Sequence, residues 1–290
     1  MSGAEVARQR PLLGLALTLG AAVSYGVTAL FARIAYDGAA TPLAVICARY
    51  WVAVVALALL ARVRGVPMGL PAGQRAWGMA VGVLLTFVAY GYLGSVRWIP
   101  VGLAALVLYT YPIMVTLCAR PVLGQRPTAL RWLAALAAFA GVAIVLGVPV
   151  TSPDPWGLML AGLAACSYGA MVLLAGRLGD RVDSLRLTFD ASVWAGVFCS
   201  VAALILGDVH LPATTLGWTG FVGSVLTFTG GLIMFFAGLP HVGPMRSSGL
   251  MNLEPVVAVL AAILLLGETL SPVQGLGAAL ILLALVPLGR

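Results

Sequence analysis

The sequence predicts an all-α membrane protein with ten transmembrane helices in two inverted five-helix repeats. Of its 290 residues, 62% are hydrophobic and only 9% are charged, whereas charged residues make up about a quarter of a typical soluble domain. Apolar runs of about 20 residues recur along the whole chain, and a run of this length crosses the hydrocarbon core of a bilayer. The arginines also gather on alternate loops, and the second half of the sequence repeats the first.

The expected spans are joined by short connections, which leave no room for a separate soluble domain. The first apolar run is too long for the core of a cleavable signal peptide, so we expect it to be a membrane span. The ten spans cover approximately residues 12–35, 41–61, 75–97, 101–120, 128–147, 156–177, 185–207, 215–238, 243–266 and 271–289.

The arginines orient these spans. All sixteen basic residues are arginine, and the net charge of +7 would favour nucleic-acid binding in a soluble chain. Here we attribute the charge to topology and expect no nucleic-acid partner. Because loops rich in basic residues stay in the cytoplasm, both termini are predicted to be cytoplasmic. The opposite side carries Asp37, Asp154, Asp208 and Glu268, with Arg97 as its main exception. The arginine-rich side carries Arg8, Arg10, Arg62, Arg64, Arg75, Arg120, Arg126, Arg131, Arg177, Arg181, Arg186, Arg246 and Arg290.

The two halves of the chain repeat short words in the same order. Ser24-Tyr25-Gly26 recurs as Ser167-Tyr168-Gly169, and Pro112 recurs as Pro255, both at a displacement of 143 positions. Several matches in one order at one displacement indicate duplication. We expect the repeats to cover residues 12–147 and 155–289.

The number of spans in each repeat decides their relative orientation. Each repeat has five spans, an odd number, so the second copy enters the membrane from the opposite side. Inverted repeats of this kind place a substrate site near the bilayer midplane and suit alternating access. A transport function is therefore predicted.

The chain resembles the EamA-type members of the drug/metabolite transporter superfamily. The resemblance rests on the paired repeats, each with a proline-containing helix that leads to a Leu-Gly-Glu-like turn, and on Arg49 in the second span. These turns are Leu266-Gly267-Glu268 and Leu123-Gly124-Gln125, in which Gln125 departs from the usual acidic residue. The resemblance implies a bacterial inner-membrane carrier, often an exporter of amino acids or other small metabolites. It also implies a cavity lined by the first, third, fourth, sixth, eighth and ninth helices.

Glu254 is the strongest candidate for a binding residue, because a charged group inside a membrane span is costly and is usually functional. It could bind a substrate ammonium group or exchange a proton; alternatively, it stays protonated or bonds to groups freed by Pro255. Asn252 offers an amide beside it, and Met251 shares a helical face with it. Arg49 could bind a substrate carboxylate, or pair with Asp190 or a helix end, and the structural role is favoured. Asp190 is also expected to pair with Arg186, four residues earlier.

Several hydroxyl groups complete the candidate cavity. A buried phenol needs a hydrogen-bond partner, and Tyr90 and Tyr109 are predicted to line the cavity, with core packing as the alternative. Tyr25 and Tyr168, further candidates for the cavity, occupy equivalent repeat positions, which favours a shared structural role beside the pseudo-twofold axis. Thr227 could line the cavity too, although small residues in the first and eighth spans favour close helix packing.

The sequence lacks the signatures of other chemistry. It has no phosphate-binding glycine loop and no HExxH motif, and its four cysteines lie within apolar runs, so we expect no cofactor, no metal and no enzyme activity. The predicted function is a secondary carrier, monomer or homodimer, that exports an amino acid or similar metabolite. An organic-phosphate or nucleotide-sugar carrier and a membrane-embedded protein without transport activity are the alternatives.

Overall fold

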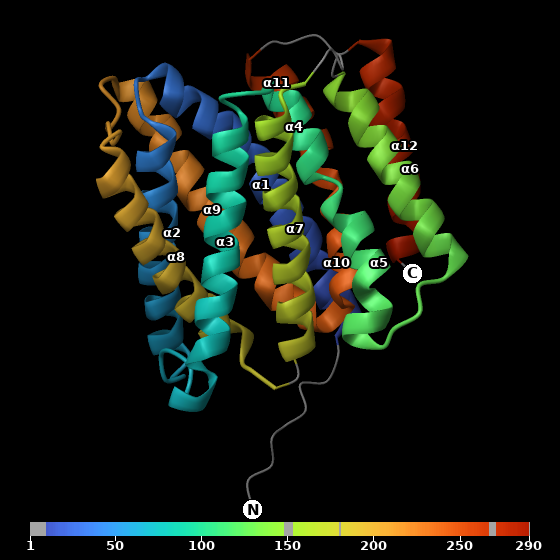
Figure 1. Ribbon diagram of the computed structural model, residues 1–290, viewed down its shortest axis with the longest axis horizontal. Helices are drawn as coiled ribbons and strands as arrows, with labels where there is room; N and C mark the ends of the chain where they lie inside the picture. Colours follow the sequence, from blue (N-terminus) through green and yellow to red (C-terminus); the bar gives the residue numbers. More distant parts are fainter. Residues whose placement is uncertain (1–9, 148–152, 180, 267–270, 290) are drawn as a thin grey trace, which may run out of the picture.

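The computed structural model describes residues 10–147, 153–179, 181–266 and 271–289, and these residues form helices joined by short loops without any β-strand (Figure 1). Nine described segments are long and apolar enough to span a membrane, and a tenth apolar helix, Pro272–Leu288, is shorter. The elements are α1 (Pro11–Asp37), α2 (Pro42–Val63), a 3-10 turn (Ala72–Gln74), α3 (Arg75–Ser95), α4 (Val101–Leu108), α5 (Tyr111–Leu123), α6 (Ala129–Leu146), α7 (Pro155–Leu178), α8 (Ser184–Leu206), α9 (Thr215–Val242), α10 (Pro244–Leu250), α11 (Leu253–Leu266) and α12 (Pro272–Gly289).

Two of the predicted spans are broken into pairs of helices. The span expected at 243–266 consists of α10 and α11, which are separated at Met251 and Asn252. Pro255 lacks an N–H group and cannot bond to the carbonyl of Met251, four residues earlier. That carbonyl instead accepts the N–H of Glu254 at 3.0 Å. The fourth span is likewise divided into α4 and α5 just before Pro112.

The first helix of each half packs into the other half. Helix α1 packs against α9 and α11, whereas α7 packs against α3 and α5. Helix α2 packs against α8, and α6 packs against α12, so that these two pairs lie at opposite ends of the bundle (Figure 1). Each of these interfaces therefore joins a helix of the first half to a helix of the second half.

The pairing of α1 with α9 depends on small residues, as the sequence predicted. A β-carbon added to Gly220 would lie 2.5 Å from the backbone nitrogen of Ala35, and one added to Gly14 would lie 2.5 Å from the β-carbon of His241. Neither site has room for a larger residue. The hydroxyl of Thr28 also donates a hydrogen bond to that of Thr227 across this interface at 2.8 Å. Close small-residue packing is thus confirmed here.

The loop between α2 and α3 is tied to the first turns of α8. Asp190 accepts a hydrogen bond from the backbone N–H of Leu70 at 3.0 Å, and the Nε of Arg186 donates to the carbonyl of Pro67 at 2.9 Å. Each side chain thus makes its hydrogen bond to the loop, while Arg186 stays close enough to Asp190 to interact with it electrostatically, as the spacing of four residues predicted. The predicted alternative partner, Arg49, bonds elsewhere, to Ser224 on α9.

Candidate functional site

The two helix breaks meet in the interior of the bundle. Tyr109 lies in the break between α4 and α5, and its phenol faces the carboxyl group of Glu254 at the start of α11 as a hydrogen-bond partner. Tyr109 is buried, and Glu254 is partly buried. Broken helices that meet inside a membrane bundle expose backbone groups where a polar solute can bind.

Phenols surround this carboxyl group. Tyr111, which follows the first break, stacks on Tyr168 of α7 with ring centroids 4.1 Å apart. The hydroxyl of Tyr111 reaches the carbonyl of Ser248 in α10 at 3.5 Å, so the stack links both broken spans. The tyrosines close enough to interact electrostatically with Glu254 are Tyr25, Tyr92, Tyr109, Tyr111 and Tyr168.

Asn252 supplies a free acceptor within the second break. Its side-chain amide nitrogen donates to the carbonyl of Gly249 at 3.0 Å, while its Oδ1 atom is buried without a hydrogen-bond partner. The hydroxyl of Ser247, in α10, is likewise buried and unpaired. Buried polar atoms without partners are rare and costly, and these two lie at or next to the second helix break. Met251 is fully buried, with 0% exposure, and packs in the core.

Arg49 lies on α2 and extends to α9. One guanidinium nitrogen donates to the hydroxyl of Ser224 at 2.6 Å, and the guanidinium carbon lies 5.2 Å from the ring centroid of Phe228. Its Nε atom is buried and has no hydrogen-bond partner among the residues that the structure describes. No carboxylate among the described residues forms an ion pair with Arg49, although Glu254 interacts with it electrostatically. This cation therefore has unused capacity to bind an anion.

Two predicted site residues have partners that explain them as structural. The hydroxyl of Tyr90 donates to the carbonyl of Cys199 on α8 at 2.8 Å. Thr227 accepts from Thr28 and donates to the carbonyl of Gly223 at 2.7 Å. Tyr90 thereby links α3 to α8, and Thr227 links α9 to α1 and to its own preceding turn. The structure brings Glu254, Tyr109, Tyr25 and Tyr168 together, and Tyr90 and Thr227 make their bonds elsewhere.

Tyr111 and Phe228 lie at the candidate site, but the sequence did not assign a binding role to either one, and Tyr111 was noted only as one of several tyrosines within the spans. The repeat contained the signal for Tyr111, because it occupies the position equivalent to Glu254 at the displacement of 143. Phe228 packs against both Tyr25 and Tyr50, with each pair of ring centroids 5.6 Å apart. Its position between Tyr25 and Arg49 depends on the rotation of α9, for which the sequence carries no comparable signal.

Metal binding finds no support in the described part of the chain. Among those residues, no three side chains of the types His, Cys, Asp or Glu are grouped closely enough to hold a metal ion. The polar groups at the helix breaks are phenols, an amide, a carboxyl group and a guanidinium group. Groups of these types form hydrogen bonds and ion pairs with charged or polar organic molecules.

Residues 12–147 and 155–289 each match the model of the EamA-like transporter family. The chain belongs to this family. An EamA-like transporter is a carrier rather than an enzyme, and relatives from the drug/metabolite transporter superfamily support this assignment. An uncharacterised inner-membrane transporter, YedA of Escherichia coli K12, is 28% identical over 72% of this chain and 70% of its own length. With nine apolar spans described, this EamA-like transporter is a multi-pass inner-membrane protein.

Two further relatives and one solved structure extend the comparison. The threonine/homoserine exporter RhtA of Escherichia coli K12 is 27% identical over 70% of this chain and 67% of its own length. Protein PecM of Dickeya dadantii is 29% identical over the same shares of the two chains. A solved crystal structure with 18% sequence identity superposes with a TM-score of 0.81, covering 94% of this chain and 95% of the other. That likeness shows the fold.

Proposed function

We propose that this EamA-like transporter exports a small zwitterionic metabolite, with an amino acid as the favoured substrate, across the inner membrane. The observation that carries the proposal is the meeting of two broken helices at Tyr109 and Glu254. Such breaks near the middle of a bundle form the substrate sites of carriers with inverted repeats. The related protein RhtA, a threonine/homoserine exporter, supports the substrate class.

Glu254 and Arg49 offer opposite charges to one substrate. Glu254 binds the ammonium group, and Asn252 Oδ1 adds an acceptor beside it. The unpaired Nε–H of Arg49 donates a hydrogen bond to the substrate carboxylate, and Tyr25 lies close enough to interact with both charged side chains. A substrate that carries both charges would neutralise both side chains at once, which lowers the cost of charge inside the membrane.

The packing of the helices supports alternating access. Each half contributes walls to the centre through α1 and α7, as two inverted five-helix repeats would. Rocking of these halves exposes the site first to the cytoplasm and then to the outside. In this arrangement both termini are cytoplasmic, because most arginines then face the cytoplasm.

An organic-phosphate or nucleotide-sugar carrier is less well supported. A dianionic phosphate favours several cationic partners, whereas Arg49 is the arginine beside the helix breaks in the described part of the chain. The apolar and phenolic surroundings suit a zwitterion with a small or apolar side chain. A membrane protein without transport activity would leave the unpaired acceptor atoms unexplained.

Reconstitution into liposomes tests the proposal. We expect counterflow of labelled threonine, homoserine or another amino acid from a broad panel, and we expect Glu254→Gln to raise KM about tenfold or more, as for the loss of a charged hydrogen bond. Asp208→Asn is the matched control, because it removes one negative charge from a side chain that is 63% exposed. A folded protein that moves no solute of the panel would contradict the carrier. Equal KM values for Glu254→Gln and wild type would contradict the assigned site.

A further inference from the structure

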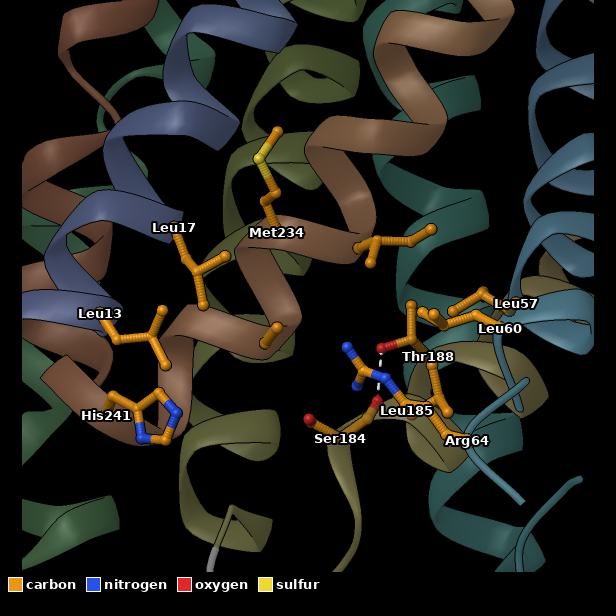
Figure 2. A pocket seen from close by; sticks show the side chains of 12 residues that line it. Leu13, Leu17, Leu57, Leu60, Arg64, Ser184, Leu185, Thr188, Met234 and His241 are labelled. Atoms are coloured by element: carbon orange, nitrogen blue, oxygen red, sulfur yellow. Dashed lines mark hydrogen bonds between the residues drawn. The ribbon is translucent and has the colours of Figure 1, made fainter. Parts of the chain in front are cut away.

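A cleft separates α1 and α9 from α2 and α8 at the end of the bundle where α1 begins. Its volume is about 320 Å³, which lies within the roughly 300–1,000 Å³ typical of small-molecule sites. Figure 2 shows its two walls, with Leu13, Leu17, Met234 and His241 on one side and the α2 and α8 residues on the other. The cleft is distinct from the helix breaks and from the residues around Glu254.

The walls of the cleft are mainly aliphatic. Leu17, Leu57, Leu60 and Ile233 line it, and Met234 reaches its deeper part (Figure 2). A buried water needs two to four polar partners, which such walls do not supply. The hydroxyl of Thr188 is already used, because it donates to the carbonyl of Ser184 at 2.6 Å. An apolar chain is therefore a better occupant than water.

The mouth of the cleft is cationic. Arg64 follows the last residue of α2, and its guanidinium group extends from that helix toward the middle of the cleft (Figure 2). Arg64 is exposed, and no hydrogen bond or ion pair is formed by its side chain within the described part of the chain. His241, in the last turn of α9, lines the opposite wall. Among the residues that the structure describes, none of those lining the cleft is acidic.

The helix packing leaves this cleft accessible from the side. Helix α1 packs against α9, α10 and α11, whereas α2 packs against α8 and α9. In Figure 2 the ribbons of α1 and α2 stand on opposite sides of the cleft. Helices α1 and α2 are therefore not extensively packed against each other beside the cleft, and a membrane is the source of acyl chains for a cleft between its spanning helices.

We propose that this cleft binds an anionic phospholipid, with an acyl chain between the aliphatic walls and the headgroup phosphate on Arg64. Guanidinium groups form bidentate, charge-assisted hydrogen bonds with phosphate, and basic pockets between membrane helices bind anionic headgroups. The aliphatic walls are complementary to an acyl chain, and the guanidinium group of Arg64 is complementary to an anionic headgroup. The bound lipid contacts α1 and α9 as well as α2 and α8, so it bridges elements of both halves. This site does not depend on the proposed substrate.

Native mass spectrometry of the purified full-length protein tests the site. Phosphatidylglycerol and phosphatidylcholine with identical acyl chains are titrated separately in a neutral detergent. We expect wild type to bind phosphatidylglycerol about tenfold more tightly, as for a charged hydrogen bond to phosphate. Arg64→Ala should abolish this preference. Arg62→Ala is the matched control, because Arg62 is exposed on the same turn of α2 and does not line the cleft.

A steric variant tests the acyl-chain position independently. Ala237 lines the cleft, and Ala237→Phe should weaken the binding of both lipids while the melting temperature without lipid shows that the variant is folded. Equal affinity of wild type for the two lipids would overturn the proposal, as would a retained preference in Arg64→Ala. Stronger binding of free laurate than of phosphatidylglycerol would also overturn it, because the occupant would then be a free fatty acid.

Discussion

Gly26 of α1 lies directly against the backbone of Glu254 on α11. A β-carbon added to Gly26 would lie 2.7 Å from the carbonyl oxygen of Glu254 and 2.7 Å from the β-carbon of Val257. At the equivalent repeat position, a β-carbon on Gly169 would lie 3.7 Å from the carbonyl oxygen of Tyr111. Gly26→Ala therefore requires α1 and α11 to separate, whereas Gly169→Ala fits at ordinary contact distance.

We predict that Gly26→Ala lowers the free energy of unfolding by about 1–3 kcal/mol, as for other overpacked sites. It should also impair transport, because it displaces Glu254. Gly169→Ala is the matched control and should be neutral or slightly stabilising, since alanine favours a helix by about 1 kcal/mol over glycine. Thermal unfolding in detergent and liposome transport measure both variants. If Gly26→Ala and Gly169→Ala lose the same stability and the same transport activity, the closer contact at Gly26 has no effect.

The hydroxyl groups of two tyrosines are expected to have different roles, one in substrate binding and one in helix packing. Tyr109 faces Glu254, whereas Tyr90 bonds to the carbonyl of Cys199. Tyr109→Phe should raise KM about tenfold, because the lost hydroxyl orients a charged group. Tyr90→Phe should lower the free energy of unfolding by about 1 kcal/mol with no change in KM. Transport kinetics and thermal unfolding of both variants test the assignment, and an unchanged KM in Tyr109→Phe would contradict it.

Thr227 is expected to act in helix packing. Its hydroxyl accepts from Thr28 across the α1–α9 interface, and interhelical hydrogen bonds of this type contribute about 0.6 kcal/mol. Thr227→Val should lower the melting temperature slightly and leave KM unchanged. Thr219→Val is the control, because Thr219 is exposed and bonds only within its own helix, to the carbonyl of Thr215. If KM increases in Thr227→Val but not in Thr219→Val, Thr227 acts in substrate binding and the packing assignment is contradicted.

Asp190 stabilises the loop between α2 and α3. Asp190→Ala leaves the N–H of Leu70 without its partner and should cost about 1–3 kcal/mol of unfolding free energy. Asp190→Asn keeps an acceptor oxygen and should cost less. Chemical unfolding of the two variants in detergent gives the comparison. If both variants lose the same stability, charge rather than this hydrogen bond explains the role of Asp190.

The sequence was sufficient to predict the helical membrane fold and the break in the helix before Pro255. Apolar length located the spans, and the costly charge of Glu254 beside Pro255 located the second helix break. The small residues of α1 and α9 predicted their close packing. These features depend on composition and local backbone chemistry, both of which follow from the sequence without knowledge of tertiary contacts.

The roles of individual side chains were harder to predict, because they depend on the rotation of each helix against its neighbours. Tyr90 and Tyr109 look alike in the sequence, yet one bonds to α8 and the other faces Glu254. Asp190 and Arg186 have the spacing of a helical pair, but both find backbone partners on a loop more than 100 residues away. Tertiary contacts override local spacing in these cases.

The exchange of first helices between the two halves has a consequence for biosynthesis. Helix α1 (Pro11–Asp37) takes its packing partners from α9 (Thr215–Val242) and α11 (Leu253–Leu266), which leave the ribosome long after it. Helix α1 therefore lacks these packing contacts in the membrane until the second half of the chain has been inserted. Two separately expressed halves should be degraded when alone and persist when produced together.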